Sequence, residues 1–152
     1  MKFSTRQDVQ APIERLFARA TDFDRFERVL RRKGINVTRL ETPLDDPALM
    51  CWKAEVEYRG KARKIQVDLS ELSAPTRVCM TSQVNGVVSV MEADFVAITP
   101  KKSRMIVKLD LTPKTLAARL FVQSLKLGKA NLDRKFAERV ERYAAMLVDE
   151  SG

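Results

Sequence analysis

The sequence predicts an α+β fold in which a curved antiparallel sheet of about seven strands surrounds a long C-terminal helix. Apolar and polar residues alternate with a period of two through most of residues 35–111, which is typical of half-buried strands. Two short stretches with helical spacing precede this region, and a long helical stripe follows it. A helix of about 35 residues would be about 50 Å long, so it fits one domain only if the sheet curves around it.

The first elements are a weakly alternating strand at residues 2–10 and two short helices. The first helix begins at Pro12, because the fixed φ of proline suits a helix start. Thr21 or Asp22 caps the second helix, and Gly34 ends it. The expected apolar face of this second helix consists of Phe23, Phe26, Val29 and Leu30.

Turn residues separate the expected strands. Asn85-Gly86 is the strongest hairpin signal, because both residues tolerate the positive φ of a type I′ turn. Other breaks are expected at the Pro43–Pro47 loop, at Arg59-Gly60, at Ala74-Pro75 and at residues 100–102. The result is a meander of about six antiparallel strands with one apolar and one solvated face.

The long helix is expected to have Thr112 as its N-cap and Pro113 as its first residue. Gly128 lowers helix stability and permits a bend midway. The main apolar stripe consists of Phe121, Leu125, Leu132, Phe136, Val140, Tyr143 and Leu147.

A second apolar set, Leu116, Leu120 and Leu127, lies about half a turn from this stripe. Cover by a loop or by the helix of Phe23 and Phe26 is the first interpretation. A homodimer contact is the second, and an anionic membrane surface beside a cavity mouth is the third.

The composition excludes several kinds of site. The 152 residues contain no histidine, which removes Ser-His and Cys-His nucleophiles and imidazole metal ligands. Cys51 and Cys79 are too few for a four-cysteine zinc site, and free thiols are favoured over a bridge between them. Neither a metal nor a cofactor is therefore expected.

The net charge of +8 raises the question of an anionic partner. Basic residues of the terminal helix are scattered around its polar arc, and no aromatic side chains interleave with them as stacking platforms. Nucleic acid is therefore disfavoured, although the second helix carries its own cluster. The two groups are Arg25, Arg28, Arg31, Arg32 and Lys33, and then Arg119, Lys126, Arg134, Lys135 and Arg142.

Residues 1–152 are expected to form a single cytoplasmic domain. The first residues lack the apolar core of a signal peptide. The longest apolar run, residues 143–148, is too short to cross a bilayer.

Two stretches carry a resemblance to a known superfamily: APIERLFARATDFDRFERVLRRKG at residues 11–34 and LTPKTLAARLFVQSLKLGKANLDRKFAERVERYA at residues 111–144. With the order of elements, they resemble the START-like, birch-pollen-allergen-like (SRPBCC) superfamily, which includes polyketide cyclase/dehydrase-like proteins. The resemblance implies a helix-grip fold with an apolar cavity between sheet and helix. Members bind lipids, sterols, quinones, polyketides or aromatic hormones there, and a minority are enzymes. It implies no specific catalytic residue in this chain.

The expected function is binding, and by extension transport, of a small hydrophobic molecule such as a lipid, quinone or polyketide. A polyketide cyclase/dehydratase-like enzyme using Tyr58, Arg63 or a shifted carboxylate is the alternative, and the missing histidines favour binding. An interaction module using the basic helices and Leu116, Leu120 and Leu127 is the second alternative. Candidate ligand-binding residues are Trp52, Val56, Tyr58, Arg63, Ile65, Val67, Met80, Met91, Phe95, Phe121 and Leu125.

Some candidates have polar groups in apolar registers. Arg63, Tyr58, Ser82 and Ser89 could each orient a ligand oxygen. The favoured interpretation is structural: Arg63 extends its charge to water, and Tyr58 bonds a backbone carbonyl. Glu92 and Asp94 fall on the solvated face, so an acid–base role for them is disfavoured.

Overall fold

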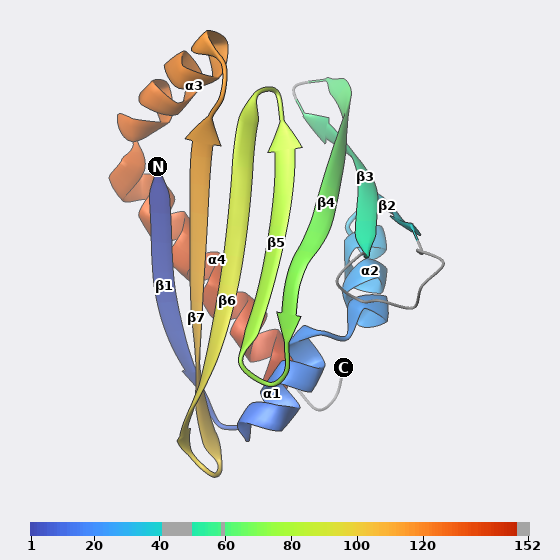
Figure 1. The fold of residues 1–152 in the computed structure, drawn as a ribbon, viewed down its shortest axis with the longest axis vertical. Coiled ribbons are helices and arrows are strands. Elements are labelled where there is room, and N and C mark those ends of the chain that lie inside the picture. Colours follow the sequence, from blue (N-terminus) through green and yellow to red (C-terminus); the bar gives the residue numbers. More distant parts are fainter. Residues whose placement is uncertain (41–49, 59, 149–152) are drawn as a thin grey trace.

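The computed structural model describes residues 1–40, 50–58 and 60–148, with the side chain of Tyr58 outside the description. Its strands form one antiparallel sheet in the order β1-β7-β6-β5-β4-β3-β2 (Figure 1). The elements are β1 Lys2–Val9, α1 Ile13–Ala20, α2 Phe23–Arg32, β2 Asn36–Leu40, β3 Cys51–Tyr58, β4 Lys61–Ser73, β5 Arg77–Val84, β6 Val87–Thr99, β7 Lys102–Pro113, α3 Leu116–Lys126 and α4 Lys129–Val148.

The predicted fold class is confirmed, because β2 to β7 form the expected meander and β1 pairs with β7. The β5–β6 hairpin turns at Asn85 and Gly86, whose φ values of 50° and 79° are those of a type I′ turn. Strand β4 ends just before Ala74-Pro75, as expected. The Pro43–Pro47 loop and Arg59 lie outside the described residues.

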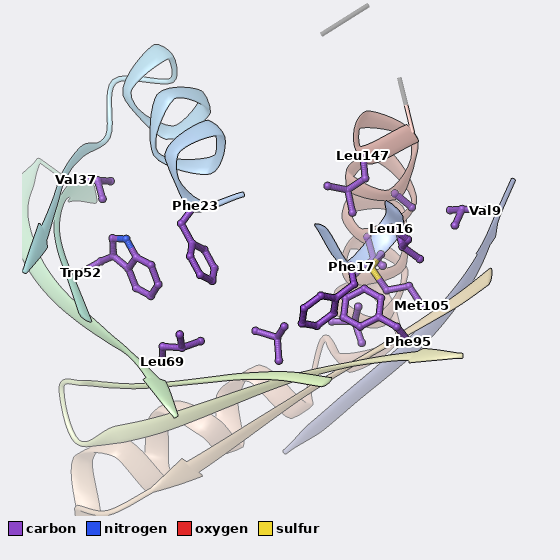
Figure 2. Packing of buried hydrophobic residues seen from close by; sticks show 14 residues of the cluster. Val9, Leu16, Phe17, Phe23, Val37, Trp52, Leu69, Phe95, Met105 and Leu147 are labelled. Carbon is purple, nitrogen blue, oxygen red and sulfur yellow. The ribbon is translucent and has the colours of Figure 1, made fainter. Parts of the chain in front are cut away.

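The two faces of the sheet follow the sequence alternation. Residues directly opposite each other in neighbouring strands share a face, and Leu69, Met80 and Met91 are aligned in this way across β4, β5 and β6. Phe95 aligns with Met105 on the same face. This inward face lies against the helices, and the sheet curves around them, with the buried side chains between (Figure 2).

The expected start of the long helix is wrong. Thr112 and Pro113 remain in β7, where they pair with β6. Thr115 is the N-cap instead, and its hydroxyl accepts a hydrogen bond of 3.1 Å from the Ala118 amide. The adjoining hairpin leaves little space: a Cβ on Gly86 would lie 2.6 Å from the Thr115 hydroxyl oxygen. Sheet pairing therefore outweighs the local cap signal at residues 112–113.

The terminal helical region is two helices rather than one. At Leu127 and Gly128 the backbone bonds run to residues three positions back, and α4 begins at Lys129. Glycine in a helix interior costs about 1 kcal/mol relative to alanine, so Gly128 is a weak point for this break. The break lets α3 and α4 pack on the sheet independently, and Figure 1 shows α3 at the end of β7 with α4 behind the sheet.

The predicted stripe holds in α4 but not throughout α3. Val140 and Leu147 are buried, and the Phe136 ring lies 5.7 Å from the Phe3 ring. In α3 the buried residues are Ala118 and Val122, which pack with Val87 of β6. The prediction that Phe121 belongs to the core is wrong, because its side chain is 53% exposed. It lies to one side of the face that α3 turns to the sheet.

Helix α2 also turns a different face inward. Asp22 caps it by accepting a bond of 3.2 Å from the Arg25 amide, as one of the two expected caps. Phe23 and Glu27 are its buried residues, while Phe26 is 38% exposed and was wrongly placed on the apolar face. Figure 1 shows α2 beside β2 and β3, at the opposite edge of the sheet from α3, so it does not cover the leucines of α3.

Candidate functional site

The inward face changes from buried to solvent-accessible both along its strands, from Phe95 to Met91, and across them, from Leu69 to Met91. Leu69, Phe95 and Met105 are at most 3% exposed, with Phe17 of α1 packed edge-on against Phe95. Met91, two inward positions from Phe95 on the same strand, is 41% exposed. The described helices therefore cover one part of the inward face and leave an apolar part in contact with solvent.

Several predicted ligand-binding residues share this accessible part, which we call the accessible inward surface. The strand register places Met80 of β5 opposite Met91 of β6. Val67 of β4 is opposite Ser82 of β5, so Val67 and Met80 are diagonal neighbours on the same face. The side chains other than Met91 are half-buried. The accessible inward surface consists of Val56, Ile65, Val67, Met80 and Met91.

The remaining predicted residues lie elsewhere. Trp52 and Phe95 belong to the core, at 6% and 3% exposure. Leu125 is half-buried on α3, and Phe121 projects from the same helix toward solvent. The side chain of Tyr58 lies outside the described residues.

Polar groups border the accessible inward surface. Ser82 and Ser89 are directly opposite each other on β5 and β6, and both are half-buried. Arg63 faces inward opposite Val56, and its Nε is buried. Hydroxyl and guanidinium groups beside an apolar surface can orient a ligand oxygen by hydrogen bonding.

A buried carboxylate that the sequence interpretation missed fixes Trp52. The indole Nε1 donates to Oε1 of Glu27 at 2.8 Å, and Nε of Arg39 donates to the same oxygen at 2.6 Å. The bond with Glu27 is the largest cause of the raised pKa of Arg39. The centroid of the Trp52 ring lies 5.1 Å from that of the Phe23 ring. Figure 2 shows the two side chains next to each other. Trp52 therefore anchors α2 to β2 and β3.

The spacing of residues along α2 indicates that Glu27 faces the sheet. Glu27 is one helical turn after Phe23, so the two share the face that α2 turns to the sheet. A charged residue on such a face needs a partner, because burying an unpaired charge is costly. Arg39 supplies that partner from β2, which a reading of α2 alone does not reveal.

Two further polar groups meet between α2 and α4. Arg25 of α2 donates from Nη2 to the carbonyl of Met146 at 3.4 Å. Its Nη1 is buried, and no group in the described part of the chain accepts a hydrogen bond from it. Burial raises the pKa of Tyr143 of α4 to about 12, and the positive charge of Arg25 partly opposes this. The Tyr143 phenol therefore stays protonated to a higher pH than an exposed tyrosine does.

Titration of Tyr143 has a testable consequence. Because the folded pKa of about 12 exceeds the ordinary value near 10, the contribution of Tyr143 to stability is present below pH ~10 and is lost as the pH rises toward ~12. Spectrophotometric titration of tyrosinate is expected to show a late step that Tyr143→Phe removes. If the wild-type protein shows no late step, and Tyr143→Phe instead removes part of the step at the ordinary value, the burial effect is contradicted.

Solved structures of other proteins share the fold of this chain. No family model and no curated protein matches the chain. In a search of solved structures, TTHA0849 from Thermus thermophilus matches with a TM-score of 0.66 at 13% identity, over 100% of both chains. The Zhui aromatase/cyclase from a Streptomyces species matches at 0.66 and 11% identity, over 100% of this chain and 98% of that one. A START superfamily protein from Mycobacterium smegmatis matches at 0.58 and 17%, over 93% and 98%. This chain has the helix-grip fold.

The outer face of the helix-grip sheet is charged and internally paired. Arg77 lies 2.8 Å from Asp94, 3.1 Å from Glu92 and 3.3 Å from Glu71, measured between side-chain nitrogens and oxygens. Glu92 and Asp94 thus face away from the accessible inward surface, as predicted. Cys79 lies beside this cluster, and Cys51 and Cys79 are both free thiols.

The basic cluster of α2 is divided by the helix-grip packing. Arg25 turns toward α4, and Arg31 donates from Nη2 to the Val37 carbonyl at 3.0 Å. Arg28 and Arg32 remain exposed. The cluster therefore does not form one continuous basic strip.

A surface hollow lies apart from the accessible inward surface. It is lined by residues of α1, of the end of β6 and of the turn that follows, none of which is a predicted ligand-binding residue. The residues that line the hollow are Ile13, Glu14, Ala97, Ile98, Thr99 and Pro100.

Among the described helices, none has the length and apolarity needed to cross a bilayer.

Proposed function

We propose that this helix-grip protein binds a small hydrophobic molecule, such as a lipid, quinone or polyketide, on its accessible inward surface. The observation that carries the proposal is the solvent contact of inward-facing apolar side chains, above all the 41% exposure of Met91. Burying apolar area contributes about 25 cal/mol per Å², so a ligand that covers this surface is stabilised by removing it from water.

The chemistry of the surface supports an adaptable apolar ligand. Met80 and Met91 stand opposite each other, and thioether side chains adjust to differently shaped partners. Ser82, Ser89 and Arg63 are the nearest polar groups on the same face. A ligand with an apolar body and one oxygen-bearing end fits this distribution.

The cyclase-like alternative finds less support. A shifted carboxylate was one of the three groups that it could use, besides Tyr58 and Arg63, and the described carboxyl group with a changed pKa is that of Asp8. Its pKa is lowered chiefly by the hydrogen bond from Arg104, and Asp8 lies on the outer face of β1. A lowered carboxyl pKa on the outer face supplies no general acid to the inward surface.

One pair of substitutions tests the binding proposal. Met91 and Val96 lie on opposite faces of β6 and are 41% and 44% exposed. Met91→Lys is expected to weaken binding of the uncharged fluorescent probe Nile red by about ten-fold, because the ligand would have to desolvate a charge. Val96→Lys is the matched control and is expected to change the probe affinity less than about two-fold.

Native mass spectrometry of the purified full chain supplies a second readout. The wild-type protein is expected to retain an apolar small molecule that Met91→Lys releases and Val96→Lys keeps. Equal probe binding by both variants, together with no retained molecule in the wild-type protein, would refute the proposal.

A further inference from the structure

The outward side of α3 carries the three most exposed large apolar side chains of the described residues. Leu116, Leu120 and Leu127 are 75%, 61% and 91% exposed. At 100° per residue they lie on the side of the helix opposite Ala118 and Val122, which pack on the sheet. We call these three residues the α3 leucine face. Helix α3 packs on the sheet through its other side, so the fold of the chain does not require leucines at these three positions.

The charge around this face is of one sign. Residues 111–132 contain four cationic side chains and no aspartate or glutamate. Lys129 pairs with Asp133 at 2.9 Å, whereas no ion pair joins Lys114, Arg119 or Lys126 to any residue in the described part. Arg119 and Lys126 are seven positions apart, so they form one flank of the leucine face.

From this combination we infer that the α3 leucine face docks on an anionic lipid surface, with Lys114, Arg119 and Lys126 contacting the headgroups. A helix with leucines on one side and uncompensated cations beside them is suited to lie in the interface of such a membrane. A fluid surface also requires no complementary pocket, which suits three leucines projecting from a single convex helix.

A second copy of the chain fits this face less well. A two-fold dimer brings the same patch of both copies together. Arg119 and Lys126 would then approach their own copies, and the segment offers no carboxylate to pair with them. Like charges brought together at an interface oppose association.

The position of α3 relates this docking to ligand access. Ala118 and Val122 pack with Val87, next to the β5–β6 turn. Met91 and Ser89 lie on the part of β6 that follows this turn, and the buried Phe95 lies farther along the strand. Docking through α3 therefore brings the accessible end of the inward face near the membrane. The inference itself does not depend on a ligand being bound.

Vesicle sedimentation of the full chain tests the inference. Vesicles of phosphatidylcholine containing one quarter phosphatidylglycerol are expected to bind the wild-type protein more strongly, by about ten-fold or more, than vesicles of phosphatidylcholine alone. The difference comes from the attraction between the cationic side chains and the anionic headgroups. The combined Leu116→Ser, Leu120→Ser and Leu127→Ser variant is expected to lose about ten-fold or more of this binding.

Two control variants match the substitutions. Val96→Ser with Ile98→Ser removes apolar side chains that are 44% and 41% exposed at the end of β6 away from the β5–β6 turn, and is expected to bind like the wild type. Arg119→Glu with Lys126→Glu should weaken binding as the leucine variant does. Arg28→Glu with Arg32→Glu changes the net charge equally at exposed positions of α2 and should have less than about a two-fold effect.

Several outcomes would overturn the inference. These are absence of wild-type binding to the anionic vesicles, unchanged binding of the leucine variant, or equal losses in the two charge variants. A concentration-dependent dimer that the leucine substitutions dissociate, without vesicle binding, would assign the face to a second copy instead. If the triple variant does not fold, Leu127→Ser alone, at the most exposed position, is expected to reduce binding with an unchanged unfolding midpoint.

Discussion

Replacing Glu27 with alanine is expected to lower the free energy of unfolding by about 3 kcal/mol. The substitution removes the acceptor for Trp52 Nε1 at 2.8 Å and for Arg39 Nε at 2.6 Å. It leaves a buried indole N–H without its bond and a guanidinium, 21% exposed, without its more buried partner. Such losses cost about 1–3 kcal/mol for a buried donor and about 3–5 kcal/mol for a broken buried ion pair.

Urea unfolding followed by the fluorescence of Trp52, the single tryptophan, measures this loss. Asp24→Ala is the matched control, since Asp24 accepts from the same Arg39 at 2.6 Å but its side chain is 72% exposed. That control is expected to cost less than about 1 kcal/mol. Equal effects of the two substitutions would show that the buried Glu27 bonds do not anchor α2.

Replacing Phe95 with alanine is expected to cost about 3–5 kcal/mol of unfolding free energy. Phe95 is 3% exposed, and its ring stands nearly perpendicular to that of Phe17 at a centroid distance of 5.5 Å. Its removal leaves a cavity between α1 and the sheet that the surrounding β6 and β7 backbone cannot close. Denaturant titration of the variant is the direct measurement.

Met91→Ala separates a core role from a ligand-lining role on the same face of the same strand. Because Met91 is 41% exposed, its truncation is expected to cost less than about 1 kcal/mol. The affinity of the Met91→Ala protein for the hydrophobic probe should fall. The Phe95→Ala protein should instead show its main effect as a loss of stability. A stability loss at Met91 as large as that at Phe95 would place both residues in one filled core.

The strand pattern could be predicted because each strand has one buried and one solvated face. Met91 and Phe95 were placed on one face and Glu92 and Asp94 on the other from alternation alone, and the register agrees. A turn such as Asn85-Gly86 is equally local, because its φ requirements belong to the two residues themselves. These features depend on neighbours in the sequence, so they are visible there.

Errors arose where a local signal competed with a distant partner. Thr112 and Pro113 look like a helix start, but pairing with Val88 and Val87 keeps them in the sheet. Phe121 and Phe26 look like core residues, but the orientation of each helix is set by its contact with the sheet. A helical pattern with apolar residues on two sides does not say which side the rest of the protein covers.

The polar groups near the candidate site could not be predicted as groups. Arg25 and Tyr143 are more than a hundred positions apart, and they meet because α2 and α4 pack on the same inward face. Glu27 looked like one more charge on a basic helix until Trp52 and Arg39 gave it partners. Such encounters depend on chain topology rather than on spacing.

By itself, the sequence determined the fold class, the order of the elements and which residues share a face of the sheet, since short-range periodicity encodes each of these. The tertiary structure alone decided how far each face is covered. It placed Phe95 under α1 and left Met91 in contact with solvent, and it turned Ala118 toward the sheet and Leu116, Leu120 and Leu127 away from it. Burial results from contacts between elements far apart in the chain, which no periodicity within one element can specify.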